Sequence, residues 1–264
     1  MSAAADATPD SPEPGGRPSE APVREAPVRE AHVEAVRTAR YYVVGDVAAA
    51  RTVWIALHGY GQLAGYFARH FAPHAGPEGG LAVVVPEALS RFYLATEGGR
   101  DASARVGATW MTREDRRAEI DDYVRYLDRV LDVAVGGDGR GNPAAPALAV
   151  LGFSQGAATA CRWLAHRQRE GRPPAVRLVL WGGALPQELD VADPDGVLRR
   201  TRPTLVVGDA DEFATPSVVA EQEARLAAAG VPYDVVRFAG GHRLDRATLA
   251  PDPSLSKTVQ PTPV

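Results

Sequence analysis

Residues 148–161 read Leu-Ala-Val-Leu-Gly-Phe-Ser-Gln-Gly-Ala-Ala-Thr-Ala-Cys, and they are the most informative part of the sequence for the fold. Four apolar residues, typical of a buried strand, lead into the pentad Gly-Phe-Ser-Gln-Gly at 152–156, and small residues that favour a closely packed helix follow. A serine on such a strand–turn–helix is held on a sharp turn with its hydroxyl exposed, and the flanking glycines leave room for the turn. The pattern predicts Ser154 as a nucleophile; the other interpretation is a glycine-rich turn with a surface serine.

Short apolar runs alternate with helical patterns outward from this stretch, which predicts an α/β sandwich with a mainly parallel central sheet. Most of the runs are continuous, as in strands that are covered on both faces. One-face spacing predicts a helix over residues 112–131, with Thr112 and Asp115 as a capping pair at its start. Two of the runs contain charged residues and are expected nearer a sheet edge, namely Val176–Trp181 and Tyr233–Phe238. The other expected strands are Tyr41–Val44, Val53–Leu57, Leu81–Val85, Leu148–Leu151 and Thr204–Val207.

Composition sets the domain limits. Residues 1–36 hold six prolines and almost no large apolar side chain, and residues 251–264 hold four more prolines. Both segments are predicted to be disordered tails, because they cannot bury enough surface to offset the entropy of ordering. One folded α/β domain is therefore expected over residues 37–250.

Charge and cysteine content exclude several function classes. The 264 residues include 29 Lys and Arg against 33 Asp and Glu, and acidic and basic residues are interleaved, so no nucleic-acid partner is expected. A single cysteine, Cys161, rules out an intramolecular disulfide and a Cys-rich zinc site. No apolar run is long enough for a membrane span. We expect a cytoplasmic monomer or homodimer that needs no metal or cofactor.

A hydrolytic serine needs a base and an orienting carboxylate, each on a loop after a later strand. His242 follows the run Tyr233–Phe238 and is the expected base. The loop after Thr204–Val207 offers Asp209, Asp211 and Glu212. Asp211 is the preferred acid, because the loop must leave the strand before a side chain can turn toward His242. Asp209 is the alternative, and is otherwise expected to hold the loop through backbone N–H groups.

The transition state also needs hydrogen-bond donors for its oxyanion. The glycine-lined turn that contains Tyr60 follows the run Val53–Leu57, so the backbone N–H groups of Tyr60 and Gln155 are the expected pair. His58 is expected to brace this turn. Four further residues are expected either to line the acyl pocket or to pack in the core or a flap: Phe92, Tyr93, Trp110 and Met111.

Four motifs together resemble the phospholipase/carboxylesterase family of α/β-hydrolases, which includes the acyl-protein thioesterases. They are Leu-His-Gly-Tyr-Gly at 57–61, Gly-Phe-Ser-Gln-Gly at 152–156, Gly-Asp-Ala-Asp at 208–211 and Gly-His at 241–242, and the similarity spans about residues 40–249. The resemblance implies an α/β-hydrolase fold with helices on both sheet faces and no large lid domain. It also implies Ser154, Asp211 and His242 as catalytic residues, with Tyr60 and Gln155 as oxyanion donors.

The expected activity is therefore hydrolysis of carboxylic esters of small or short-acyl substrates through an acyl-enzyme. Two alternatives stay open: lysophospholipase or acyl-thioesterase activity on longer acyl chains, and a catalytically silent protein of the same fold that binds a ligand or partner.

Overall fold

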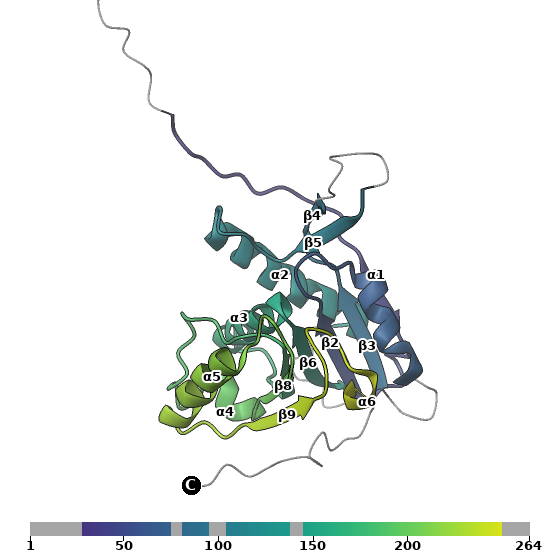
Figure 1. Cartoon of the computed structure of the whole chain (residues 1–264). Coiled ribbons are helices and arrows are strands. Elements are labelled where there is room, and N and C mark those ends of the chain that lie inside the picture. Colours follow the sequence, from purple (N-terminus) through teal and green to yellow (C-terminus); the bar gives the residue numbers. More distant parts are fainter. Residues whose placement is uncertain (1–27, 75–80, 95–103, 138–144, 250–264) are drawn as a thin grey trace, which may run out of the picture. The chain divides into compact units, whose positions relative to one another are not determined.

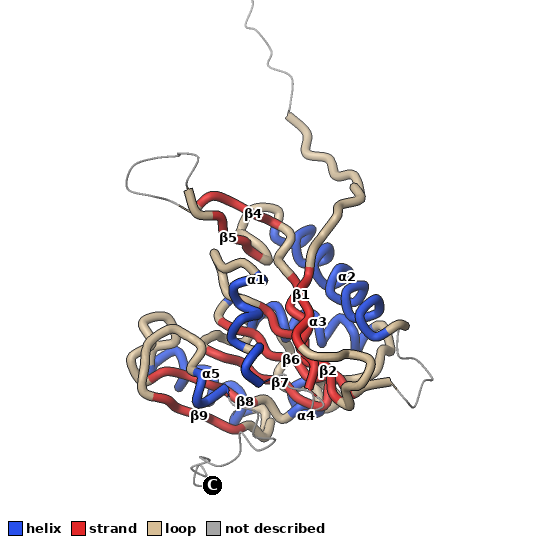
Figure 2. The backbone as a smooth tube through the Cα atoms, turned by 90° about the vertical axis from the view of Figure 1, so that its right-hand side faces the viewer, coloured by secondary structure: helices blue, strands red, loops and turns tan. Residues whose placement is uncertain are grey.

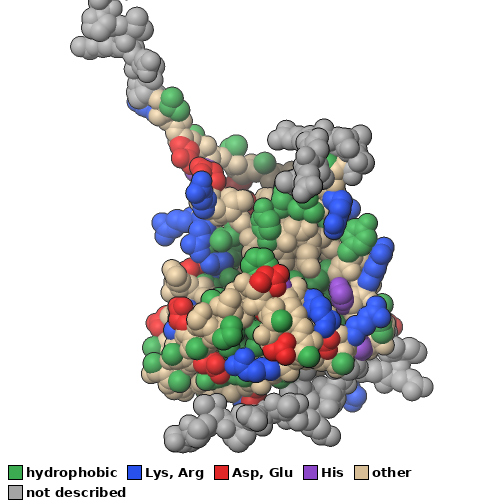
Figure 3. Space-filling model, viewed as in Figure 1, with side chains coloured by type: hydrophobic (Ala, Val, Ile, Leu, Met, Phe, Trp, Pro, Cys, Tyr) green, Lys and Arg blue, Asp and Glu red, His purple; other side chains and the backbone are tan. Residues whose placement is uncertain are grey.

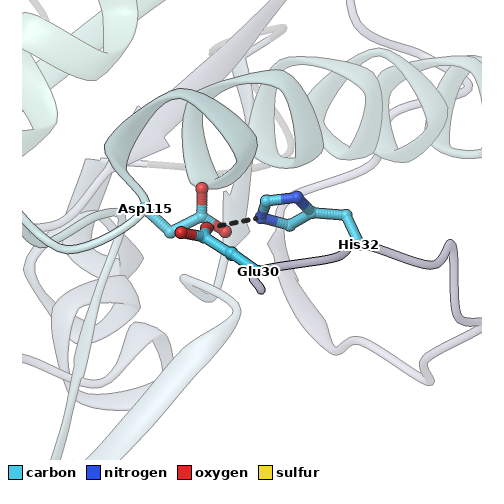
Figure 4. A group of neighbouring side chains, drawn as sticks. All are labelled: Glu30, His32 and Asp115. Atoms are coloured by element: carbon cyan, nitrogen blue, oxygen red, sulfur yellow. Dashed lines mark ion pairs between the residues drawn. The ribbon is translucent and has the colours of Figure 1, made fainter. Parts of the chain in front are cut away.

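The computed structural model describes residues 28–74, 81–94, 104–137 and 145–249. The predicted tails fall largely outside this part, since residues 1–27 and 250–264 are not described. The chain divides into two compact units, residues 1–37 and residues 38–264. In the first unit, residues 28–37 form neither helix nor strand and are exposed, and His32 Nε2 lies 3.3 Å from Glu30 Oε1 (Figure 4).

A seven-stranded sheet forms the centre of the second unit. Six strands are parallel, and only the first, at one edge, is antiparallel to its neighbour. In sheet order the strands are β1 (Tyr41–Val44), β3 (Leu81–Pro86), β2 (Thr52–Leu57), β6 (Ala147–Phe153), β7 (Ala175–Trp181), β8 (Thr204–Gly208) and β9 (Asp234–Phe238) (Figure 1). All seven apolar runs of the sequence are therefore strands of one sheet.

Helices cover both faces of this sheet. One face packs against α2 (Arg116–Val135), α3 (Gln155–Arg169), α4 (Val197–Thr201) and α5 (Pro216–Ala228). The other face packs against α1 (Ala64–Phe67), its short 3₁₀ continuation Ala68–His70, and α6 (Arg246–Leu249). Consecutive strand residues such as Leu205 and Val206 enter opposite layers, because side chains alternate along a strand. The mainly parallel sheet with two helical layers is confirmed, and the described residues contain no large lid domain.

A small hairpin, β4 (Ser90–Tyr93) and β5 (Val106–Thr109), stands apart from the large sheet (Figure 2). The sequence prediction did not include it. A further 3₁₀ turn, Ala72–His74, follows the first. None of the helices in the described part of the chain has the combination of length and apolar character that crossing a bilayer requires.

Two sequence expectations about these elements are wrong. The long helix begins at Arg116 rather than near Thr112, because Thr112 binds Glu119 through its N–H and hydroxyl and Asp115 has a left-handed backbone (φ 44°). The strand β7 lies inside the sheet between β6 and β8, although β9 does form an edge. Charged side chains near the start of β7, such as Arg177, do not prevent its interior position.

A buried carboxylate, Asp128 on α2, ties this helix to α3. Its Oδ1 accepts hydrogen bonds from Trp163 Nε1 at 3.1 Å and from Arg167 Nη1 at 2.7 Å. The guanidinium of Arg172 approaches its Oδ2 at 3.4 Å. Both Asp128 and Arg167 are buried, so the loss of one partner leaves a charge without compensation.

A buried histidine, His58, joins the end of β2 to the segment that follows β3. Its Nδ1 lies 2.8 Å from Gly59 O, and its Nε2 accepts the backbone N–H of Ala88 at 3.1 Å. These partners assign the neutral tautomer with the proton on Nδ1. Burial lowers the pKa of His58 to about 4, so the ring stays neutral in the folded chain. His58 thus braces the turn at 59–62, as expected.

Replacement of Asp128 by Ala should reduce the free energy of unfolding by about 3 kcal/mol, because Arg167 is then buried unpaired. Urea denaturation followed by circular dichroism measures the change. The matched control is Asp122→Ala on the same helix, where the pair with Arg125 is more than half exposed and should contribute less than about 1 kcal/mol. Equal losses in the two variants would contradict this account of Asp128.

The buried His58 should make stability depend on pH. Between pH 6.5 and about 4 the unfolded chain binds a proton at this residue and the folded chain does not, so stability should fall as the pH falls, by about 1.4 kcal/mol per unit. We therefore expect the free energy of unfolding, measured with urea across this pH range, to change more steeply with pH in the wild type than in His58→Gln. The difference in slope should correspond to about one proton. The same slope in both proteins would refute the prediction.

Candidate active site

Ser154 occupies the turn between β6 and α3. Its backbone has φ 55° and ψ −118°, a conformation that a non-glycine residue adopts only when its surroundings impose it. The flanking glycines are required: a Cβ on Gly152 would lie 2.2 Å from Gly156 O, and one on Gly156 would lie 2.2 Å from Leu57 O. The turn is therefore sharp because three backbone segments meet there.

Asp211 and His242 are brought together by the loops after β8 and β9. His242 Nδ1 lies 2.9 Å from Asp211 Oδ2 and 3.0 Å from Oδ1. Asp211 is buried, and its Oδ1 also accepts the backbone N–H groups of Phe213 (2.9 Å) and Ala214 (2.8 Å). A carboxylate held in this way fixes the orientation of the imidazole ring and leaves Nε2 available.

Asp209, the alternative acid, has a different position. Its Oδ1 accepts the backbone N–H of Gly240 at 2.9 Å, in the loop that leads to His242. Its own N–H donates to Phe238 O at 3.0 Å. Asp209 therefore joins the two loops, while Asp211 contacts the imidazole.

The imidazole of His242 lies between two phenyl rings. Its centroid is 4.8 Å from that of Phe153, which directly precedes Ser154, and 4.7 Å from that of Phe213. Among the described residues, Ser154 Oγ makes no hydrogen bond, so no hydrogen bond joins the serine to the imidazole of His242 in this structure. Catalytic hydrogen bonds are often long without substrate and tighten when it binds.

Within the described part of the chain, the backbone N–H groups of Tyr60 and Gln155, near Ser154, make no hydrogen bond. Gln155 is the first residue of α3, where N–H groups point out of the helix and the helix dipole is positive. The turn at Gly59 lies against the serine, since a Cβ on Gly59 would lie 3.1 Å from Ser154 Cβ. An anionic oxygen above Ser154 would meet an electropositive surface.

The side chain of Gln155 has a role that the sequence analysis missed. Its Oε1 accepts the N–H of Trp110 at 3.1 Å, and its Nε2 donates to Met111 O at 2.8 Å and to Thr109 Oγ1 at 3.0 Å. An amide side chain in the first turn of the helix after the pentad was the available signal, because the polar atoms of a partly buried amide need hydrogen-bond partners.

The hairpin also supports the turn at 59–62. Gly61 N–H donates to Ala108 O at 2.9 Å, and Ala108 N–H donates to Gln62 O at 3.1 Å. The ring of Phe92 lies against that of Tyr60, with centroids 5.1 Å apart. The hairpin and the residues just after it therefore contact both the turn that contains Tyr60 and the start of α3 that contains Gln155.

A cleft of about 410 Å³ opens beside Ser154. Gly182, Leu185 and Phe213 form part of its apolar wall. Its polar wall contains Gln155 and Gln187 together with three charged residues: Arg116, Arg162 and Glu188.

None of the four expected pocket residues is among those that line this cleft. Trp110 is buried in the core, where its Nε1 donates to His58 O at 2.8 Å, so it has the packing role. Tyr93 is exposed on the hairpin. Phe92 packs on Tyr60, and Met111 is partly buried against the core with its Sδ 3.8 Å from Arg162 Nη1. Among the described residues of the second unit, no three His, Cys, Asp or Glu ligand atoms lie close enough to hold a metal ion.

Comparison with solved structures shows the fold. Acyl-protein thioesterase 2 from Zea mays is 20% identical, with a TM-score of 0.57, and the match covers 80% of this chain and 95% of that one. A carboxylesterase from Mesorhizobium loti is 18% identical, with a TM-score of 0.55 and coverage of 80% and 92%. A phospholipase/carboxylesterase from Dyadobacter fermentans is 20% identical, with a TM-score of 0.52 and coverage of 81% and 94%. The predicted α/β-hydrolase fold and the resemblance to these proteins are confirmed.

Sequence comparison identifies the family. No curated protein matches the chain. A sequence model described as "Serine hydrolase (FSH1)" matches residues 53–248, which is most of the chain and includes every candidate catalytic residue. The chain therefore belongs to the serine hydrolase (FSH1) family.

Proposed function

We propose that this serine hydrolase cleaves carboxylic esters of small or short-acyl substrates, with Ser154 as nucleophile, His242 as base and Asp211 as the orienting acid. The pair between Asp211 and His242 Nδ1 carries the proposal, because it leaves the other ring nitrogen to act on a hydroxyl. The strained backbone of Ser154, which lines the cleft, supports it.

The reaction has two steps. Nε2 of His242 takes the hydroxyl proton as Ser154 Oγ adds to the ester carbonyl. The N–H groups of Tyr60 and Gln155 stabilise the oxyanion, each by about 3 kcal/mol. The C–O bond then breaks, the imidazolium returns its proton to the leaving alcohol, and water hydrolyses the acyl-enzyme by the same route.

The charged wall of the cleft favours small or polar substrates over long acyl chains, since an alkyl chain would remove water from the ion pair of Arg162 and Glu188 without offering it a hydrogen bond. Thioesters are the second substrate class to compare, because a structural neighbour is an acyl-protein thioesterase. We infer no metal or cofactor, and propose a cytoplasmic monomer or homodimer.

Replacement of Ser154 by Ala should reduce the turnover of p-nitrophenyl butyrate by at least about 10⁴-fold, because no other group can form the acyl-enzyme. A fluorophosphonate probe should label the wild type and not the variant. Folded wild-type protein that the probe does not label would instead indicate a binding protein of this fold.

Matched variants of Asp211 and Asp209 test which of the two carboxylates orients His242. Asp211→Asn should lower kcat by about 10³- to 10⁴-fold, because an amide cannot stabilise the imidazolium that forms. Asp209→Asn keeps the oxygen that accepts the Gly240 N–H, so it should change kcat by less than about tenfold. Circular dichroism should show that both variants are folded, and the reverse order of effects would exchange the two roles.

A further inference from the structure

The cleft beside Ser154 meets a second cavity, of about 530 Å³, between α2 and α3. The two cavities share Arg162, Pro186 and Glu188 as lining residues. The ion pair between Arg162 and Glu188 therefore lies where the two cavities meet. A substrate that extends from Ser154 along α3 reaches this ion pair.

Positive charge predominates around the two cavities. Four arginines line them against two carboxylates, although the whole chain has a formal net charge of −4. These charged lining residues are Arg116, Arg117, Arg162, Arg169, Asp121 and Glu188. Basic side chains gather around one end of α2 in Figure 3 as well. A groove with this balance attracts anions.

Glu188 compensates only part of this charge. Its Oε1 accepts Arg162 Nε at 2.6 Å and Arg116 Nη2 at 3.0 Å, so one carboxylate serves two guanidinium groups. Burial alone would raise the pKa of Glu188, but the hydrogen bond from Arg162 and the charges of both arginines hold it at about 2. Among the described residues, Arg116 Nε is buried without a partner. The Arg116 side chain is 41% exposed, and among the described residues its Nη1 makes no hydrogen bond, so a guanidinium donor remains for a second anion.

From these contacts we propose that the substrate of this enzyme carries a carboxylate that Arg116 and Arg162 bind. The inference rests on the proposed function and specifies its substrate class. Arg162 lies eight residues after Ser154, which is about 12 Å along α3, and helical side chains lean toward the N-terminus and thus toward the serine. Several atoms therefore separate the carboxylate from the reacting carbonyl.

The carboxylate belongs to either the acyl part or the alcohol part of the ester, and two pairs of substrates distinguish these sources. The acyl pair is the mono-p-nitrophenyl ester of adipic acid against p-nitrophenyl hexanoate. The alcohol pair is 4-carboxyphenyl butyrate against 4-carbamoylphenyl butyrate. In one pair the anionic ester should have a kcat/KM roughly tenfold or more above its neutral partner, and added salt should reduce that ratio.

Three variants test the residues. Arg162→Gln and Arg116→Gln should bring the ratio of anionic to neutral kcat/KM toward one, mainly through KM. Glu188→Gln removes the competing charge but keeps an oxygen that can accept from both arginines, so the arginines stay in place and the ratio should rise. This variant keeps the test valid if Arg162→Gln fails to fold. Arg125→Gln is the control, because this exposed arginine on α2 pairs with Asp122 and does not line the cavities. It should leave activity and ratio unchanged.

The outcomes separate this inference from the function on which it rests. Hydrolysis of the neutral esters with no anionic preference in either pair overturns the carboxylate site and leaves the serine esterase intact. A preference that persists in both arginine variants also overturns it. Failure to hydrolyse any ester, together with no fluorophosphonate labelling of the folded wild type, overturns the proposed function itself.

Discussion

Three backbone segments meet at the turn after β6 with no space for a side chain between them. The start of α3 approaches the carbonyl end of β2 so closely that only hydrogen fits on Gly156, and Gly152 is limited in the same way by Gly156 O. Because the contact is backbone to backbone, it fixes where α3 begins relative to β2. The spacing between the N–H groups of Gln155 and Tyr60 follows from it, and so does the strained conformation of Ser154.

The hairpin adds a second constraint to the same place. Its main chain binds the turn at 59–62, and the residues just after it bind the side chain of Gln155. The turn that contains Tyr60 and the side chain of Gln155 are therefore both held by the hairpin segment. These contacts leave the backbone N–H groups of Tyr60 and Gln155 free. In the reaction proposed above, donors held in this way would not need to reorient when the oxyanion forms, which is the condition for large transition-state stabilisation.

The central sheet and the pairing of Asp211 with His242 could be predicted from the sequence because local pattern carries that information. Continuous apolar runs indicate strands, and loops after parallel strands share one edge, which brings Asp211 to His242. The hairpin could not be predicted, because its two short strands pair across a long connection and lack a continuous apolar run. The cleft was missed for a similar reason: Arg116, Arg162 and Glu188 are far apart in sequence, and only tertiary packing makes them neighbours.

Partly buried ion pairs contribute little net stability, because desolvation offsets their attraction, so stability alone does not explain Glu188 at the wall of the cleft. The packing of α2 on α3 already has a buried ionic tie at Asp128. The loop that carries Glu188 is itself held by α5, through Gln222 Oε1 on Leu185 N–H at 2.9 Å and Arg225 on the adjacent carbonyls. Glu188 thus holds both arginines in place before substrate arrives. An anion that binds there meets guanidinium groups that the fold has already ordered, so binding loses little further side-chain entropy.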